Sequence, residues 1–420
     1  MTSKSYVKNL DNFTSMFDKK FNDAIIKLIH FLEKNDFQGW EPYDILSDRW
    51  MLIIKPRLFR VLITQIFRLS PIFVHPHFKE KKYYTKAVAL LAHAFLILYE
   101  ISKNIKYRDQ AIFFLDWLEK HRSLLTKNFS LGSQYQLNMK NYDSSTNTPS
   151  PFITALAIEA FISAFEILGD DHYLEVATSG IRFFLDELPQ IQISFNQSYF
   201  IYHPNNLKFI PNLAAKICGT MARFYSISGD KTILKTIMNN LRYVIHWQRD
   251  DGSWYYSPDT KYSDNFHTGF ILEALAKFEY YVQDHQFNSA FLKGLSYYVN
   301  NFFSSRGRPN HKKLSGLPRN ADSLLTKVDI RDCAQGIVLF SFLLQQNKNQ
   351  SAFALNLAKW SIDHFQAKQG YFYYQQLPLY TIKRPFISMQ AWMLFGLSKM
   401  LKAMRAKPVT IETVSQTKEL

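Results

Sequence analysis

The stretch from Tyr243 to Tyr256 reads Tyr-Val-Ile-His-Trp-Gln-Arg-Asp-Asp-Gly-Ser-Trp-Tyr-Tyr, and Ser263 to Leu275 reads Ser-Asp-Asn-Phe-His-Thr-Gly-Phe-Ile-Leu-Glu-Ala-Leu. This pattern predicts a helix that ends near Gln248 and a tight turn in which Gly252 takes a positive φ. A new amphipathic helix is expected to begin near Asp264, whose short carboxylate can accept hydrogen bonds from the free N–H groups of a helix start. The stretch therefore predicts a joint between two paired helices.

The spacing Gln248-x-x-x-Gly252-x-Trp254 resembles the Gln-Trp repeat of triterpene cyclases, which are α/α toroids. Two interpretations of it stay open. In the first, Gln248 hydrogen-bonds backbone at the helix end and Trp254 stacks over it; in the second, these side chains contact a ligand.

Helical hairpins recur along the chain every ~50 to 70 residues, as in helical repeat proteins. Their first helices are expected to begin near Tyr84, Pro151, Pro211, Asp264 and Asp329. A sixth first helix opens at Pro385 without a second helix after it, while residues 21–34 form an apolar helix without a first helix before it. Pairing these two buries both apolar faces and closes an all-α (α/α)6 barrel, or toroid. We expect one domain over 21–403, after a flexible leader at 1–20 and before a polar tail at 404–420.

The composition fits packed helices, with 47% hydrophobic residues, 16% aromatic residues and only 14 glycines. The N-terminus has no signal-peptide pattern, and charged residues or histidine interrupt the apolar stretches before they reach the ~20 residues of a membrane span. These features predict a cytoplasmic protein. Cys218 and Cys333 lie in apolar helical patterns without zinc spacing. We expect buried free thiols, no metal and no cofactor.

A formal charge of +15 favours polyanionic partners. The charges are scattered and no recognition-helix motif is present, so we expect no nucleic acid. The stretch 55–68, from Lys55 through Arg57 and Arg60 to Arg68, is basic and amphipathic. It could rest on a membrane surface, which would make the protein peripheral at the inner membrane, or it could be a solvated helix face. The sequence does not indicate an oligomeric state.

Aromatic residues mark the joints that follow an outer helix and precede an inner one. In a closed ring these joints meet at one mouth, where Trp and Tyr rings can stack on sugars beside polar groups. The predicted substrate-binding residues are Tyr43, Asp44, Trp254, Tyr255, Gln335, Tyr373, Arg384 and Gln390.

Polar residues at the starts of inner helices are the catalytic candidates: Asp264, His267, Asp329 and Asp332. Asp264 and His267 are three residues apart, which places them on one helical face, and Asp329 and Asp332 repeat that spacing. Two carboxylates across the mouth could divide general acid and base roles. Equally, a histidine could abstract a proton next to a uronate carboxylate that an arginine neutralises.

Structural alternatives accompany each candidate. Asp264 and Asp329 could be simple helix caps, and His267 and Gln335 could be structural. Asp332 is the strongest catalytic candidate, because a second acid one turn into an apolar helix has no capping role. Cys333 beside it is expected to be a buried neighbour, since the sequence places no activating base near it.

Several segments together resemble a known family: Glu41-Pro-Tyr-Asp44, Pro151 to Ala160, Asp264-Asn-Phe-His267-Thr-Gly-Phe270, Val328-Asp-Ile-Arg-Asp-Cys-Ala-Gln335, Tyr371 to Tyr374, Lys383-Arg-Pro385 and Gln390-Ala-Trp-Met393. The family comprises α/α-toroid proteins encoded in bacterial exopolysaccharide and capsule gene clusters, which are six-hairpin-glycosidase-like and are often mislabelled delta-aminolevulinic acid dehydratases. The dehydratase label conflicts with the sequence, because that chemistry is expected from a (β/α)8 barrel with a Schiff-base lysine, and no alternating strand pattern is visible.

The resemblance implies surface-polysaccharide biosynthesis and a toroid similar in shape to unsaturated glucuronyl hydrolases and uronyl epimerases. We expect a carbohydrate-active or carbohydrate-binding protein for an acidic or lipid-linked saccharide, with glycosidase-, epimerase- or lyase-type acid–base chemistry if it is an enzyme. One alternative is a non-catalytic, glycan-binding scaffold of the same pathway. A terpene-cyclase-like toroid is the weaker alternative, since the sequence lacks an Asp-x-Asp-Asp motif.

Overall fold

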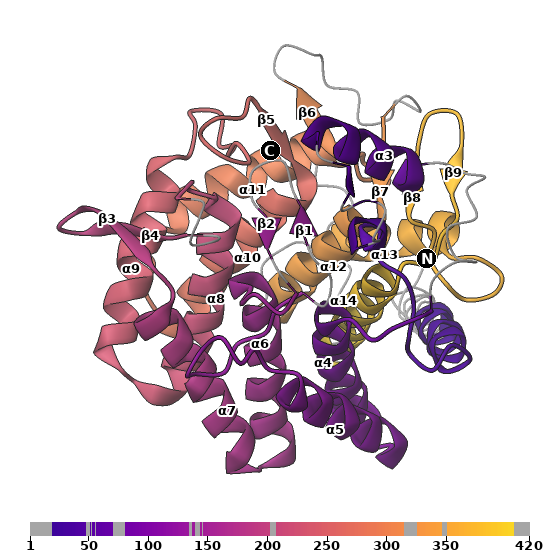
Figure 1. The fold of residues 1–420 in the computed structure, drawn as a ribbon, viewed down its shortest axis with the longest axis horizontal. Helices are drawn as coiled ribbons and strands as arrows, with labels where there is room; N and C mark the ends of the chain where they lie inside the picture. The colour runs from indigo at the N-terminus through magenta and orange to yellow at the C-terminus, as the bar shows by residue number, and fades with distance from the viewer. Residues whose placement is uncertain are drawn as a thin grey trace, which may run out of the picture.

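Six helices form a closed inner ring in the computed structural model, which describes residues 19–47, 51, 53, 54, 56–69, 80–133, 137, 138, 143, 144, 146–201, 207–314, 326–346 and 351–406. The ring consists of α4 (Thr85–Ser102), α6 (Pro151–Leu168), α8 (Pro211–Ser228), α10 (Asn265–Val282), α12 (Ile330–Gln345) and α14 (Ile387–Ala406). Each packs against the next, and α14 packs back against α4. Figure 1 shows these even-numbered helices towards the centre. The predicted all-α (α/α)6 toroid is confirmed.

Outer helices cover the ring, each packed on the inner helix that precedes it. They are α5 (Ile105–Lys120), α7 (Asp171–Arg182) with the π-helical turn η3 (Phe183–Glu187), α9 (Lys231–His246), α11 (Asn288–Phe302) and α13 (Ser351–Phe365). The helix at residues 19–33 lies next to α13 in space, because Gln366 after α13 donates a hydrogen bond to the Ala24 carbonyl at 2.8 Å and Lys20 pairs with Asp363. It therefore occupies the sixth outer position.

The ends of the chain differ slightly from the predicted boundaries. Residues 1–18 of the expected leader and 407–420 of the expected tail lie outside the described residues. Residues 19 and 20 already belong to the first helix, and α14 begins at Ile387 and continues to Ala406. The last inner helix is thus displaced from its predicted start at Pro385 and includes three residues expected in the tail.

Local sequence signals explain the hairpins. Ser150 caps α6, with Pro151 in the first turn where a missing N–H costs nothing. At the other end of the same helix Gly169 has a φ of 73°, the left-handed conformation that ends helices most easily at glycine. Close packing inside the ring needs small residues: a Cβ on Gly219 of α8 would lie 3.0 Å from the Ala274 Cα of α10.

Two inner helices, α4 and α6, are long and apolar enough to span a membrane by length and composition. Each is 72% buried within the protein over the apolar window. Their apolar character is therefore accounted for by contact with neighbouring helices on both sides and with an outer helix behind.

Six segments connect the outer helices to the inner ones, and we call them the mouth joints: residues 34–84, 121–150, 188–210, 247–264, 303–329 and 366–386. They contain η1 (Asp44–Ser47), α3 (Arg57–Leu69), and the strands β1 (Leu137–Asn138), β2 (Asp143–Ser144), β3 (Gln190–Ser194), β4 (Gln197–Phe200), β5 (Tyr262–Asp264), β6 (Lys312–Leu314), β7 (Val328–Asp329), β8 (Gln375–Gln376) and β9 (Thr381–Ile382). Antiparallel β5–β6 and β7–β8 pairing links neighbouring joints at one end of the barrel (Figure 1).

The first joint closes the ring. Glu41 accepts a hydrogen bond from the Ser388 backbone N–H of α14 at 2.9 Å, and its other oxygen lies 3.4 Å from Lys86 of α4. Asp44 accepts from the Glu41 backbone N–H at 2.6 Å and from the Tyr84 hydroxyl. We call Glu41 and Asp44 with these partners the ring clasp. Asp44 is only 3% exposed, so its place is structural, in contrast to the predicted substrate contact.

Candidate functional site

A histidine–aspartate pair lies at the start of α10. Asp264 is the N-cap and accepts from the His267 backbone N–H at 2.9 Å. The same carboxylate accepts from His267 Nδ1 at 2.7 Å, so capping and pairing are combined in one residue. Burial would raise the pKa of Asp264, but the adjacent His267 and its hydrogen bonds outweigh burial and lower the pKa to about 2. The Asp264 carboxylate is therefore charged at neutral pH and fixes the ring of His267.

A second pair joins α12 to the fifth mouth joint. Asp332 is fully buried, and His311 Nδ1 donates to its carboxylate at 3.0 Å. Burial raises the pKa of Asp332, although His311 opposes that shift. The hydrogen-bonding partner of Asp332 is thus His311, whereas the Arg331 guanidinium binds Asp329 instead. The position of His311 is fixed by its backbone N–H, which donates a hydrogen bond to the Lys327 carbonyl at 3.0 Å.

The two pairs are neighbours. In the β5–β6 register Asp264 lies opposite Lys312, and the Asn265 backbone N–H donates to the His311 carbonyl at 2.9 Å. Buried Tyr298 lies against both, because its hydroxyl donates to the Asn265 side chain at 2.7 Å and the charges of Asp332 and Asp264 add to burial in raising its pKa. This arrangement gathers two imidazoles at one mouth of the barrel. We call Asp264, His267, His311 and Asp332 the histidine cluster.

Aromatic rings surround His267. Tyr256 meets its ring edge to face at 4.7 Å, and Tyr256 is stacked parallel to Tyr262 at 6.1 Å. Phe266 lies on another side at 5.2 Å. The Lys312 ammonium sits 3.8 Å from the Tyr262 ring centroid. Half-buried rings next to cations provide stacking surfaces and positive charge at this mouth.

Asp329 belongs to an ion pair beside these histidines. It caps α12 and binds the Arg331 guanidinium through Nε at 2.9 Å and a second nitrogen at 2.7 Å, while Gln375 donates at 2.5 Å. Burial acts against its charge, but Arg331 holds the pKa of Asp329 well below its usual range. Lys327 adds a weaker contact at 3.5 Å. With both oxygens engaged, Asp329 acts as a charge partner, and a proton-transfer role has no free oxygen to use.

Tyr43 and Arg384 position α3 at the edge of this cluster. Arg68 of α3 donates to the Tyr43 hydroxyl at 2.9 Å, and Arg384 donates to the Phe67 carbonyl at 2.6 Å. The Arg68 guanidinium interacts with Tyr374, which is buried and faces the same cluster. Both predicted residues therefore lie at the mouth, each with a contact to α3.

Two predicted aromatic contacts lie elsewhere. Trp254 is 2% exposed, and its indole N–H donates to the Val244 carbonyl at 2.9 Å, so it packs between outer helices. Gln248 donates to the carbonyls of Gly252 and Ala290, which agrees with the structural interpretation of the Gln-Trp spacing. Tyr255 stacks under Arg249 at 4.4 Å, away from His267. The ring that meets His267 is the next one, Tyr256.

Three further predicted contacts are also placed outside the histidine cluster. Gln390 is buried and bridges the backbone N–H and carbonyl of Phe372. Gln335 is buried and donates to Glu273 at 2.8 Å, deeper in the barrel. Tyr373 packs against Tyr371 and Lys383. The side-chain amides of Gln335 and Gln390 are therefore committed to protein partners.

A second charged layer crosses the barrel deeper down. We call it the central ion layer, and it comprises Glu159, Lys216, Arg223, Glu273 and Lys277, all at most 7% exposed. Lys277 bridges both carboxylates, at 2.6 Å from Glu159 and 2.9 Å from Glu273. Arg223 lies 3.2 Å from Glu159. Burial opposes the charge of Glu273, but Lys216 and Lys277 outweigh it and lower its pKa to about 2. The layer ties α6, α8 and α10 together.

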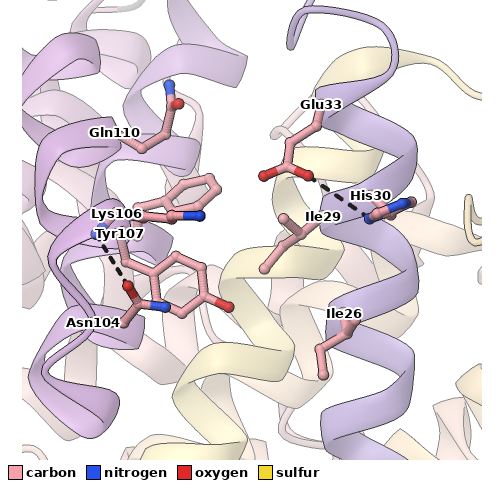
Figure 2. A pocket seen from close by; sticks show the side chains of 9 residues that line it. Ile26, Ile29, His30, Glu33, Asn104, Lys106, Tyr107 and Gln110 are labelled. Atoms are coloured by element: carbon pink, nitrogen blue, oxygen red, sulfur yellow. Dashed lines mark hydrogen bonds and ion pairs between the residues drawn. The ribbon is translucent and has the colours of Figure 1, made fainter.

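A groove of about 370 Å³ lies on the flank of the barrel between the helix at 19–33 and α5. Figure 2 shows Glu33 and Ile29 facing Tyr107 and Gln110 across it. The ionisable pair there, His30 and Glu33, is 3.8 Å apart and mostly exposed. Solvated groups at that distance are not organised for chemistry. In the part of the chain that the structure describes, no three His, Cys, Asp or Glu side chains gather as metal ligands.

No protein-family model matches the sequence, and no curated protein sequence matches it. Solved structures do. An unsaturated glucuronyl hydrolase specific for heparin has a TM-score of 0.62 at 13% identity, covering 94% of this chain and 99% of that chain. A cellobiose 2-epimerase from Spirochaeta thermophila has a TM-score of 0.58 at 11% identity over 77% and 86% of the chains, and a GH76 alpha-mannanase from Bacteroides thetaiotaomicron has 0.56 at 11% over 87% and 99%. The chain has the six-hairpin, glycosidase-like (α/α)6 fold of these proteins.

Proposed function

We propose that the protein is a carbohydrate-active enzyme that transfers protons on an acidic saccharide, with His267 and His311 as the acid–base groups. The observation that carries the proposal is the pair of neighbouring His–Asp contacts at the barrel mouth. In each, Nδ1 is used by the aspartate, so Nε2 is the nitrogen that can meet a substrate. Asp264 and Asp332 are the corresponding positioning residues.

The chemistry follows from this orientation. A carboxylate that accepts from Nδ1–H leaves Nε2 as a base and stabilises the imidazolium that forms when Nε2 takes a proton. One histidine would remove a proton from a carbon next to a carbonyl or carboxylate, and the other, protonated, would return a proton to that carbon in an epimerisation or to the adjacent carbonyl carbon in an isomerisation. The histidines then end with one proton moved between them, and the sugar is epimerised or isomerised without a net change in atoms.

Glycoside hydrolysis by two carboxylates has less support. Such enzymes need carboxyl groups that reach the glycosidic bond from two sides. Asp264, Asp329 and Asp332 are each at most 3% exposed and each is hydrogen-bonded to protein partners. The more accessible group is His267, whose side chain is 28% exposed.

The substrate class is supported by the surroundings of the histidines. The half-buried rings of Tyr256 and Tyr262 can stack on a sugar, and Lys312 beside Tyr262 can pair with an acidic substituent. The structural neighbours named above are a glucuronyl hydrolase, an epimerase and a mannanase, which supports a saccharide as the ligand.

The family resemblance supports a place in bacterial surface-polysaccharide biosynthesis. There the saccharide would be acidic or lipid-linked, and the protein would act in the cytoplasm at the inner membrane. A non-catalytic glycan-binding component of the same pathway is the competing proposal, and it predicts binding without turnover.

Proton exchange with solvent tests the proposal whichever product is formed. The protein is incubated in D2O with hexuronates, uronate-containing disaccharides and their neutral counterparts, and deuterium incorporation is followed by NMR. We expect incorporation with an acidic sugar, reduced by ~10² to 10⁴-fold in His267→Gln and His311→Gln. His30→Gln on the flank groove is the matched control and should behave as the unmodified protein. Saccharide binding with no exchange, equal in all variants, would favour the scaffold and overturn the enzyme.

A further inference from the structure

We propose that the mouth face of the barrel docks on an anionic lipid bilayer, with α3 and the tips of the β3–β4 and β8–β9 hairpins as the contacting elements. The mouth face is the surface formed by the six mouth joints. This inference goes beyond the proposed chemistry, because a docking surface can exist whatever reaction takes place behind it.

The charge of the protein is concentrated at this end. Among the described residues, the mouth joints contain 19 Lys and Arg against 10 Asp and Glu, a formal net charge of +9 out of +11 for all the described residues. The described turn residues at the opposite end, 103–104, 169–170, 229–230, 283–287 and 346, hold 1 Lys against 3 Asp. Attraction to anionic lipid, at about 1 kcal/mol for each basic residue near the surface, would therefore orient the mouth towards the membrane.

Helix α3 presents an apolar stripe to solvent. Leu58, Leu62 and Ile66 follow one another at four-residue spacing and are 78%, 54% and 53% exposed. Its other face is occupied, since Ile63 and Phe67 pack on Ile45 and Met51. Residues 51–79, which include the helix, contain five Lys and Arg and no Asp or Glu. A basic helix with exposed leucines is the composition that lies in a lipid interface.

Two hairpin tips extend the apolar surface beyond α3. Phe195 between β3 and β4 is 93% exposed, and Leu379 between β8 and β9 is 94% exposed. Thirteen of the nineteen large exposed hydrophobic side chains among the described residues belong to the mouth joints. Apolar tips spread over several joints within a basic surface suit a broad anionic bilayer better than a single peptide groove.

Docking in this way would bring the histidine cluster close to the lipid headgroups. Arg68 and Phe67 at the end of α3 contact Tyr43 and Arg384, which border the cluster. A saccharide joined to a membrane lipid would then reach His267 and His311 from the bilayer side, without leaving the membrane surface.

Vesicle co-sedimentation of the full chain tests the proposal. We expect binding to vesicles of equal parts phosphatidylglycerol and phosphatidylcholine, weakened about tenfold or more by salt that screens surface charges, and little binding to phosphatidylcholine alone. Leu58→Ser with Leu62→Ser should weaken binding at least about tenfold, and Phe195→Ser with Leu379→Ser should weaken it independently. Equal binding to both vesicle types would overturn the proposal.

Ile105→Ser with Leu292→Ser is the matched control. These residues are 53% and 54% exposed but lie outside the mouth joints, so binding should be unchanged. If this control loses binding as much as the mouth variants do, or if neither mouth variant loses any, the mouth face is not the docking surface. Deuterium exchange on a soluble saccharide should be retained in the docking variants, and vesicle binding should be retained in His267→Gln, so that failure of either proposal is seen separately.

Discussion

The histidine cluster and the central ion layer share helix α10, but their buried carboxylates have different partners. Helix α10 contributes to both, with His267 in its first turn and Glu273 and Lys277 further along. In the central ion layer every carboxylate meets lysine or arginine from a neighbouring helix, and all five side chains are buried. At the mouth Asp264 and Asp332 meet histidines, of which His267 is partly open to solvent.

This difference separates a structural arrangement from one suited to chemistry. Removing one partner of a buried, fully paired network leaves an uncompensated charge, so such networks are sensitive in stability. A histidine can exchange its proton near neutral pH, and an aspartate on Nδ1 fixes its orientation without consuming Nε2. Substitutions in the histidine cluster should therefore lower the turnover rate, whereas substitutions in the central ion layer should lower the free energy of unfolding.

The largest expected effect is on rate, in Asp332→Asn. The amide keeps the volume but no longer stabilises an imidazolium at His311, and we expect turnover to fall by ~10² to 10⁴-fold. Stability should hold or rise slightly, because a desolvated carboxylate is removed. Turnover by deuterium exchange and thermal melting of the same sample provide the comparison. Normal turnover in a stable variant would remove Asp332 from the site.

In the central ion layer, Glu159→Gln should lower stability. Loss of this carboxylate leaves Lys277 and Arg223 without their shared partner, which should cost ~3 to 5 kcal/mol in the free energy of unfolding. Urea denaturation measures it. Asp170→Asn is a suitable control, because it replaces an exposed helix cap with another good cap and should change stability little. An unfolding free energy equal to that of the unmodified protein would contradict the structural role.

Acid should weaken the central ion layer over a defined range. The pKa of Glu273 is about 2 in the folded protein against an ordinary value of 4.5, so its stabilisation is present above pH 4.5 and is lost as pH falls towards 2. The loss should total about 3 kcal/mol. In Glu273→Gln the stability at neutral pH should be lower and its dependence on pH over this range flatter. An unchanged slope would show that Glu273 is not held charged by Lys216 and Lys277.

The smallest expected effect concerns Trp254. Trp254→Phe removes the hydrogen bond to the Val244 carbonyl and should cost about 1 kcal/mol in unfolding free energy, with saccharide affinity unchanged. Isothermal titration with the saccharide found by deuterium exchange checks the affinity. Tyr256→Ala, beside His267, is the comparison and should weaken binding. Equal losses of affinity in both variants would contradict the separation of core from mouth.

The ring could be predicted because its information is local. Apolar periodicity, caps such as Ser150 and the two unpaired end helices specify hairpins and their closure without any long-range register. The contact between Asp264 and His267 could also be predicted, since helical geometry alone brings residues three apart together. His311 could not be predicted in this way. The hydrogen bond from its backbone N–H to the Lys327 carbonyl holds it near Asp332, the β5–β6 register brings it beside Asp264, and no period in the sequence encodes either contact.

The alternation of side-chain direction along extended backbone explains why the sequence alone could not choose between adjacent aromatic residues in two mouth joints. In extended segments successive side chains point to opposite sides, so an error of one position selects the wrong face. The sequence shows that Tyr255 and Tyr256, or Tyr373 and Tyr374, are aromatic, but the turn that sets their direction depends on tertiary contacts. Tyr256 contacts His267 and Tyr374 interacts with Arg331, whereas Tyr255 lies under Arg249 and Tyr373 under Lys383.

The ring clasp has a consequence for synthesis of the chain. Glu41 binds Ser388, 347 positions later in sequence, so the surface of α4 that receives α14 remains uncovered until α14 itself has left the ribosome. Until then the nascent chain is an open arc whose two apolar edges can associate with other chains. We therefore expect emergence of α14 to be the step that covers these edges, and shortening the chain before Ile387 should yield insoluble product however well the first five hairpins form.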